Sequence, residues 1–289
     1  MEISVSLNAM FNLMQYTIRV RSAIIALAII TLFAASAHAQ GDKVTVAFSD
    51  PLRPGTLKVS LIAGSITVKA YEGKDVVVES RSRTGEKSSG RAAGMKRIPM
   101  TATGMTVEEE DNKVTVSADS HQRAIDITVL VPAKTSLYLR CVNDGDIEVT
   151  GVDGEIDVNN VNGEVTLKNV AGNVVAHALN GDVKVNFTSI NAKPMAFSSL
   201  NGDIDVTFPA TLKANVVLTS TQGEVYSDFD VAMQATAPKQ TVEDNRDKGG
   251  KYRVKIEKAI QGTINGGGPE IRFKNFNGDI FIRKAGGGL

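Results

Sequence analysis

The sequence predicts an all-β protein: a β-solenoid or β-helix-like stack of short strands, with about 18–21 residues and two strands per coil. Three observations predict this class. A glycine returns every nine residues from Gly145 to Gly181. Two alternating apolar residues, most of them β-branched, follow each of these glycines, which is strand periodicity. No segment after residue 40 shows the periodicity of an amphipathic helix.

The segment 1–39 has the layout of a signal peptide. A basic segment precedes an apolar run over residues 23–35, and small residues follow at 37–39. The run has about a dozen residues, whereas a membrane span needs about 20. We expect cleavage between Ala39 and Gln40 and export to the periplasm, the cell surface or the medium. A retained N-terminal anchor helix is the alternative.

The composition of the mature chain narrows the function classes. Residues 1–39 hold two of the 32 basic and one of the 32 acidic residues, which leaves 30 and 31. A net charge near −1 gives no general reason to expect nucleic acid as a partner. The chain has no Trp and five Tyr, so few side chains are available to form a sugar-binding groove lined by aromatic rings. Cys141, the only cysteine, falls where an inward residue is due, which predicts a core side chain.

Residues 43–141 are expected to form less regular strands that cap the solenoid. The segment 62–79 already follows the repeat, with Gly64, Ile66 and Val68. The alternating segments that we expect to be strands are 43–48, 57–62, 105–109, 113–118, 124–131 and 135–141.

The regular repeats occupy residues 142–229. Glycine provides the positive φ of a tight corner, and the Asn or Asp before it tolerates the neighbouring position. If the units stack, Val165, Val183 and Ile204 lie above one another and face the core. The paired inward positions are Ile147/Val149, Ile156/Val158, Val165/Leu167, Val174/Ala176 and Val183/Val185.

The residue before each glycine indicates the length of a coil. An amide-rich series recurs at intervals of about 18–21 residues, and it consists of Asp144, Asn162, Asn180, Asn201 and Gln222. Asp153 and Ala171 fall between its members, so a coil holds two unequal strands. The asparagines could form an amide ladder along the stack. A three-faced coil of about 27 residues is the alternative.

The chain closes with further repeats. A polar excursion over residues 231–250 is followed by C-terminal repeats over 251–284, with Gly278, Ile280 and Ile282 in the expected places. We therefore expect residues 40–289 to form a single domain.

The acids after the glycines are the first candidates for chemistry. Asp146, Glu164, Asp182 and Asp203 would stack about 4.8 Å apart. Such a column could hold Ca²⁺, which takes six to eight oxygen ligands. The chain nevertheless lacks the GGxGxDxUx pattern of calcium-binding β-rolls. We interpret these acids as solvated corner carboxylates and expect no metal or other cofactor.

No arrangement in the sequence indicates a catalytic site. His121 lies in a polar run that is typical of a turn, and His177 lies in the weakest repeat strand. Neither is paired by motif with a nucleophile or with metal ligands. The two stretches that break the repeat, 81–104 and 231–250, are where an active site would be sought.

The segment 81–104 contains a basic cluster, and Glu86 is the only acid that opposes it over positions 81–97. Such a cluster could bind anionic lipid, lipopolysaccharide or acidic glycan. Because serine and glycine are interleaved, we interpret it as a solvated loop. Its basic residues are Arg81, Arg83, Lys87, Arg91, Lys96 and Arg97.

Three parts of the sequence carry a resemblance to a known family: "GSITVKAYEGKDVVVE" near the start, the serial "NGDI" and "NGEV" units, and the terminal "INGGGPEIRFKNFNGDIFIRK". Over residues 43–284 the chain resembles the bacterial putative-adhesin family of β-strand-repeat proteins, a domain family of undetermined function. The resemblance implies an exported, β-helix-like protein, and it supplies no active-site residues.

These observations together predict an exported, non-catalytic adhesin, scaffold or binding module of the bacterial envelope. The expected partner is an envelope glycan, lipopolysaccharide or another surface protein. A polysaccharide-active β-helix lyase or hydrolase is the alternative, and an accessory protein of an envelope sensing system is a third reading.

Overall fold

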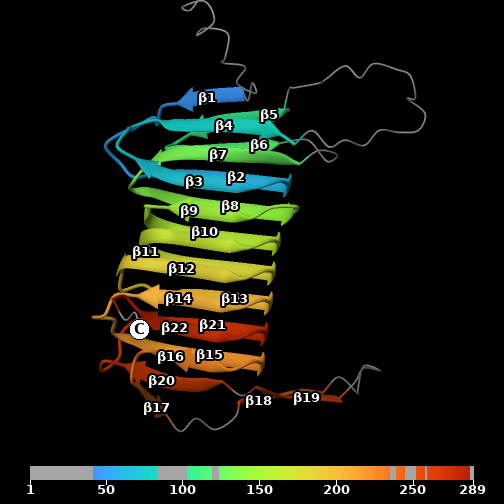
Figure 1. Ribbon diagram of the computed structural model, residues 1–289, viewed down its shortest axis with the longest axis vertical. Coiled ribbons are helices and arrows are strands. Elements are labelled where there is room, and N and C mark those ends of the chain that lie inside the picture. Colours follow the sequence, from blue (N-terminus) through green and yellow to red (C-terminus); the bar gives the residue numbers. More distant parts are fainter. Residues whose placement is uncertain are drawn as a thin grey trace, which may run out of the picture. The chain divides into compact units, whose positions relative to one another are not determined.

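Figure 1 shows the computed structural model, which describes residues 42–83, 103–118, 124–234, 239–244, 252–257 and 259–286. The chain divides into two compact units, Met1–Gln40 and Gly41–Leu289, and all of the described residues belong to the second. Strands, turns and bends make up this described part, which contains no helix. It therefore holds no helix that could cross a membrane.

Most strands stack in two columns, joined by the Asn-Gly corners (Figure 1). The first column, whose strands precede these corners, runs β5 (Met105–Glu110), β6 (Lys113–Ala118), β2 (Gly55–Ala63), β8 (Thr135–Asn143), β10 (Asp153–Asn162), the second half of β11 (Val165–Asn180), β13 (Met195–Asn201), β21 (Glu270–Asn277), β15 (Ala214–Gln222), β20 (Ile260–Ile264) and β17 (Val231–Gln234). The second column runs β1 (Asp42–Val46), β4 (Val76–Ser82), β7 (Ile125–Pro132), β3 (Ile66–Tyr71), β9 (Ile147–Thr150), the first half of β11, β12 (Val183–Ile190), β14 (Ile204–Phe208), β22 (Ile280–Lys284) and β16 (Val225–Ser227).

The register of the parallel strands confirms the two-strand coil and excludes the three-faced alternative. Val165 pairs with Val183, and Val183 pairs with Ile204, which are the spacings that the amide-rich series predicts. All three side chains are fully buried. The predicted strands of the N-terminal part are present as well, within one or two residues of their expected bounds.

The core lies between the two columns. The first column contributes residues such as Ile156 and Val158, and the second contributes Val165 and Leu167. Each fully buried side chain of this size stabilises the fold by about 1.5–3 kcal/mol. In the longer coils that follow Asn180, four phenylalanine rings fill the wider interior, with centroids 5.2–6.4 Å apart. They are Phe187, Phe197, Phe208 and Phe273.

Two coils are inserted into the stack out of chain order. The coil of β2 and β3 lies between β6/β7 and β8/β9. The C-terminal coil of β21 and β22 lies between β13/β14 and β15/β16. The expectation that residues 43–141 serve as a cap is therefore wrong for β2, β3, β6, β7 and β8, which all pair in parallel within the stack. The end of the stack is instead built by antiparallel strands, with β1 on β4, β4 on β7 and β5 on β6.

The polar excursion expected over residues 231–250 also needs correction, because it contains strands. Within it, β17 pairs antiparallel with β20, and β18 (Lys239–Asp244) pairs antiparallel with β19 (Tyr252–Glu257) in a separate two-stranded sheet. Strand pairing depends on backbone hydrogen bonds, so a polar segment can pair without an apolar face. The first part of the expected C-terminal repeats, residues 251–257, contains β19, which pairs with β18 in the separate sheet and not with the stack.

Candidate functional site

The Asn-Gly corner is held by an amide ladder, as the sequence predicts. Each asparagine side chain donates a hydrogen bond from Nδ2 to the Oδ1 of the asparagine in the preceding coil of the stack. The bonds run from Asn162 to Asn143 (2.9 Å), from Asn180 to Asn162 (2.9 Å), from Asn201 to Asn180 (2.8 Å) and from Asn277 to Asn201 (3.5 Å). The ladder reaches the inserted C-terminal coil, so these amides hold coils that are adjacent in the stack.

The carboxylates after the glycines also connect adjacent coils of the stack. Asp146 Oδ1 accepts a hydrogen bond from the backbone N–H of Glu164 at 2.7 Å. Asp182 accepts one from Asp203 at 2.9 Å, and Asp203 accepts one from Asp279 at 2.8 Å. These acids are thus tied to the next coil and are not simply solvated. Across the described residues, no three His, Cys, Asp or Glu side chains are grouped so that they could hold a metal ion.

The remaining candidates from the sequence are dispersed. Cys141 is buried, its Sγ donates to the Gly64 carbonyl at 2.9 Å, and burial raises the pKa of the thiol to about 11. It is therefore a core residue and a poor nucleophile. Arg83 is bound by Asp126 at 2.6 Å and by the Asp144 carbonyl. Burial raises the pKa of Asp126, but the hydrogen bonds from Arg83 and Ser65 outweigh it and leave this pKa below its ordinary value.

The basic cluster and the two histidines are described only in part. Arg81 is exposed in β4, whereas Lys87, Arg91, Lys96, Arg97 and the acidic Glu86 lie outside the described residues, as does His121. His177 is half-buried on the outer face of β11, and its Nδ1 lies 2.5 Å from Ser198 Oγ of β13. The structure thus brings His177 and Ser198 together, a pair that the sequence did not indicate.

An exposed apolar stripe crosses the outer face of the first column. It has one residue from each of six adjacent strands, and the register places them side by side over about 24 Å. Five of the six are 39–46% exposed. The apolar stripe consists of Ile62, Val142, Val161, Leu179, Leu200 and Phe276.

A shallow groove of about 1070 Å³ follows the apolar stripe over β10, β11, β13, β21 and β15. Its apolar side is formed by Val161, Leu179, Leu200 and Phe276. A polar row lies beside them in register and includes Asn159, His177, Ser198, Lys274 and Thr219. The groove therefore offers an apolar track with hydrogen-bonding groups along one side, which is the composition of a binding surface.

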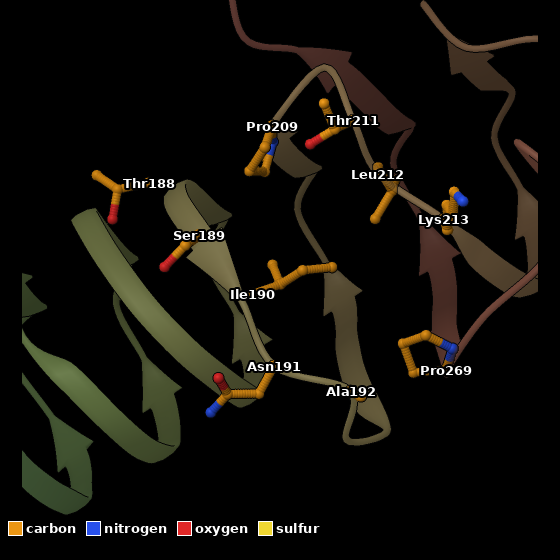
Figure 2. Close-up of a pocket in the computed structure, with 10 residues that line it drawn as sticks. All are labelled: Thr188, Ser189, Ile190, Asn191, Ala192, Pro209, Thr211, Leu212, Lys213 and Pro269. Atoms are coloured by element: carbon orange, nitrogen blue, oxygen red, sulfur yellow. The ribbon is translucent and has the colours of Figure 1, made fainter.

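Figure 2 shows a second hollow, of about 390 Å³, where the lengthened corners return from the second column to the first. Ser189 and Ile190 end β12 and Asn191 begins the corner after it, whereas Leu212 and Lys213 come from the corner between β14 and β15 (Figure 2). Lys213 is the only ionisable side chain among the residues that line this hollow. These corners supply space but no acid–base pair.

Among the described residues that line the groove, the ionisable side chains are His177 and Lys274. A reaction at Ser198 would need donors aimed at a developing oxyanion. The backbone N–H groups of β11 and β13 point along the sheet into the parallel ladder, so they are already paired with the adjacent coils.

The sequence did not predict the apolar stripe, because Val152, Val161, Val170 and Leu179 all hold the same apolar place of the nine-residue unit, two residues before each glycine, and the pattern does not separate inward from outward members. Val152 and Val170 are fully buried, whereas Leu179 is 43% exposed. In the second column, the positive φ of Gly151 and Asn169 (75° and 53°) breaks the alternation and turns the next valine inward. In the first column the alternation continues to the corner. Small apolar residues alternate without interruption at Val174, Ala176 and Ala178, and this alternation could have predicted that Leu179 points outward.

Comparisons with known proteins identify a family and two similar solved structures. The model of the family described as Toastrack DUF4097 matches residues 2–266, so β21 and β22 lie beyond the matched part. No curated protein matches the chain. Two solved structures are similar. One is a putative cell adhesion protein from Clostridium sporogenes ATCC 15579, with 11% identity, a TM-score of 0.37 and coverage of 85% of this chain and 100% of that one. The other is a putative adhesin from Bacteroides fragilis NCTC 9343, with 13% identity, a TM-score of 0.33 and coverage of 85% and 97%.

Proposed function

The chain belongs to the Toastrack DUF4097 family, and from this premise we propose that it is an exported, non-catalytic β-repeat protein that binds an envelope partner along the apolar stripe. Membership confirms the resemblance drawn from the repeat segments. The partner would be an envelope glycan, lipopolysaccharide or another surface protein, and the protein would act in the periplasm or at the cell surface.

The apolar stripe is the observation that carries this proposal. Scattered exposed apolar residues are ordinary, but a continuous row of them indicates an interaction surface. Here the row runs across six strands, and the stacked backbone fixes its spacing. A rigid, preformed track loses little conformational freedom when it binds an elongated partner.

Replacement of Leu179 by Glu tests the proposal. The mature chain is mixed with insoluble envelope fractions of the cells that produce it, and sedimented protein is measured. Because Glu places a charge in the middle of the apolar stripe, L179E should bind at least about tenfold more weakly than the unmodified chain. Its free energy of unfolding should change by less than about 1 kcal/mol, since Leu179 is already partly exposed.

The matched control is Asn186→Glu, which adds the same charge to an exposed position of β12 in the second column. It should bind like the unmodified chain. Equal binding by L179E and the unmodified chain would remove the apolar stripe from the proposal. Release of soluble saccharide fragments during the assay would instead establish the polysaccharide-active alternative.

We base the export step on the leader-like layout of residues 1–39. If a signal peptidase removes these residues, the protein recovered from the periplasm or the medium begins at Gln40. Intact mass spectrometry and N-terminal sequencing measure this directly. Recovery of a chain that retains residues 23–35 would show that the segment stays as an anchor.

A further inference from the structure

We propose that Tyr226 and Phe281, on the outer face of the second column, form a platform that binds a neutral pyranose ring of a glycan. This inference goes beyond the proposed function, because the platform lies on the opposite column from the apolar stripe. The two proposals rest on different residues, so either can fail while the other stands.

The two rings are stacked and partly open to solvent. Tyr226 in β16 pairs in register with Phe281 in β22, and their ring centroids lie 5.3 Å apart at an interplanar angle of 11°. Tyr226 remains 52% exposed although Phe281 covers part of it. Within the described residues, β16 pairs with β22 alone, so Tyr226 stands at the edge of the second column.

Charged neighbours hold the platform in place. The guanidinium of Arg283 lies 5.1 Å from the centre of the Phe281 ring, within the range of a cation–π contact. Arg283 Nε also donates to both carboxylate oxygens of Asp205, at 2.8 and 2.9 Å. Asp228, which follows β16, accepts a hydrogen bond from the Lys284 backbone N–H at 3.1 Å. Because Phe281 is held by Tyr226 and Arg283, little side-chain freedom is lost on binding.

The platform departs from the repeat around it. In the other coils of the second column, polar side chains occupy the equivalent outward position, and they are Glu148, Thr166, Lys184 and Asp205. A repeat that needed only solubility would place similar residues in the last two coils. The aromatic pair therefore indicates a role that the stack itself does not require.

The side chains around the platform favour a sugar ring that carries no charge. An aromatic face packs against the axial C–H groups of a pyranose whose hydroxyls are equatorial, and planar polar side chains beside it can bond to those hydroxyls. Arg283, Asp205 and Asp228 are such groups. Asp205 matches the charge of Arg283 and Asp228 stands against Lys284, so these charges balance and leave no net positive charge to offset the desolvated carboxylate of an acidic sugar.

Titration with defined oligosaccharides tests the platform. The probes are cellotetraose and chitotetraose, which are neutral with equatorial substituents, and tetragalacturonate, which is anionic. Binding to the mature chain is followed by saturation-transfer NMR and calorimetry. We expect saturable binding of at least one neutral probe below about 10 mM and at least about tenfold weaker binding of tetragalacturonate.

The variants separate the platform from other surfaces. Tyr226→Ala should weaken binding about tenfold, whereas Tyr226→Phe keeps the ring and should bind within about threefold of the unmodified chain. Tyr138→Ala, at an exposed tyrosine of β8 in the first column, is the control and should not change binding. Absence of saturable binding by both neutral probes overturns the proposal, and so does unchanged binding by Tyr226→Ala with thermal unfolding like that of the unmodified chain.

Discussion

At the scale of single residues, glycine recurs because adjacent coils approach most closely at the Asn-Gly corner. Gly181 has a φ of 156°, and a Cβ at this position would lie 2.1 Å from the carbonyl oxygen of Gly163. The same contact recurs in the next coil, where a Cβ at Gly202 would lie 2.3 Å from the Gly181 oxygen. The backbone conformation and the space both exclude a side chain. In the sequence Asn-Gly-Asp, the asparagine thus forms the amide ladder, the glycine allows the backbones of adjacent coils to approach, and the aspartate accepts a backbone N–H from the next coil.

Substitution of Gly181 by Ala tests this contact. We expect a loss of about 3–5 kcal/mol in the free energy of unfolding, because the methyl group forces the coils apart and strains the backbone. Gly266→Ala is the control, since Gly266 has a φ of 84° but has open space where its Cβ would stand. The Gly266→Ala variant should lose about 1–2 kcal/mol in its free energy of unfolding. Urea unfolding measures both, and equal losses would show that close packing does not explain the regular return of glycine in the repeat.

The inward residues could be predicted from the sequence, whereas the outer surface could not. Alternation after each glycine identifies Val165 and Val183, because inward positions in both columns follow the same rule. The exposure of Leu179 could not be predicted in the same way, because the positive φ of Gly151 and Asn169 turns the equivalent valine inward in the second column only. The outward direction of Phe281 is predictable in principle, because it lies between the inward Ile280 and Ile282, but its contact with Tyr226 depends on which coils are adjacent.

At the scale of elements, the C-terminal coil shows why the order of the stack could not be read from the repeat. Its register fits both neighbours: Asn277 pairs with Asn201 on one side and with Gln222 on the other. All coils share the same corner residues, so many orders would satisfy the pattern. Pairing of Asn201 with a residue as distant in the chain as Asn277, rather than with the next coil, adds only about 1 kcal/mol of loop-closure entropy.

The burial of apolar side chains in the inserted C-terminal coil outweighs its loop-closure entropy. The inserted coil buries four large side chains, each of which contributes about 1.5–3 kcal/mol. Phe273 also stacks on Phe197 of the preceding coil, with centroids 5.3 Å apart. The side chains are Ile271, Phe273, Ile280 and Ile282. Sequence-distant pairing of this kind favours slow folding, because both neighbouring coils must be in place before the inserted coil is stabilised.

At the scale of the whole described stack, the two columns present two different outer faces. The first carries the apolar stripe and its groove, and the second carries the aromatic platform beside charged side chains. The inserted C-terminal coil contributes to both, through Phe276 in the apolar stripe and Phe281 in the platform. Both surfaces therefore depend on the order in which the coils stack.

Disulfide trapping measures that order most directly. Ser198 pairs with Lys274, and Lys274 pairs with Thr219, so Ser198 and Thr219 are two strands apart. Adjacent strands lie about 4.8 Å apart, within reach of a disulfide, whereas two spacings exceed the roughly 7 Å limit. Under mild oxidation, the double variant S198C/K274C should form an internal cross-link and S198C/T219C should not. A cross-link in S198C/T219C and none in S198C/K274C would mean that the coils stack in chain order, which contradicts the inserted coil and both surfaces built on it.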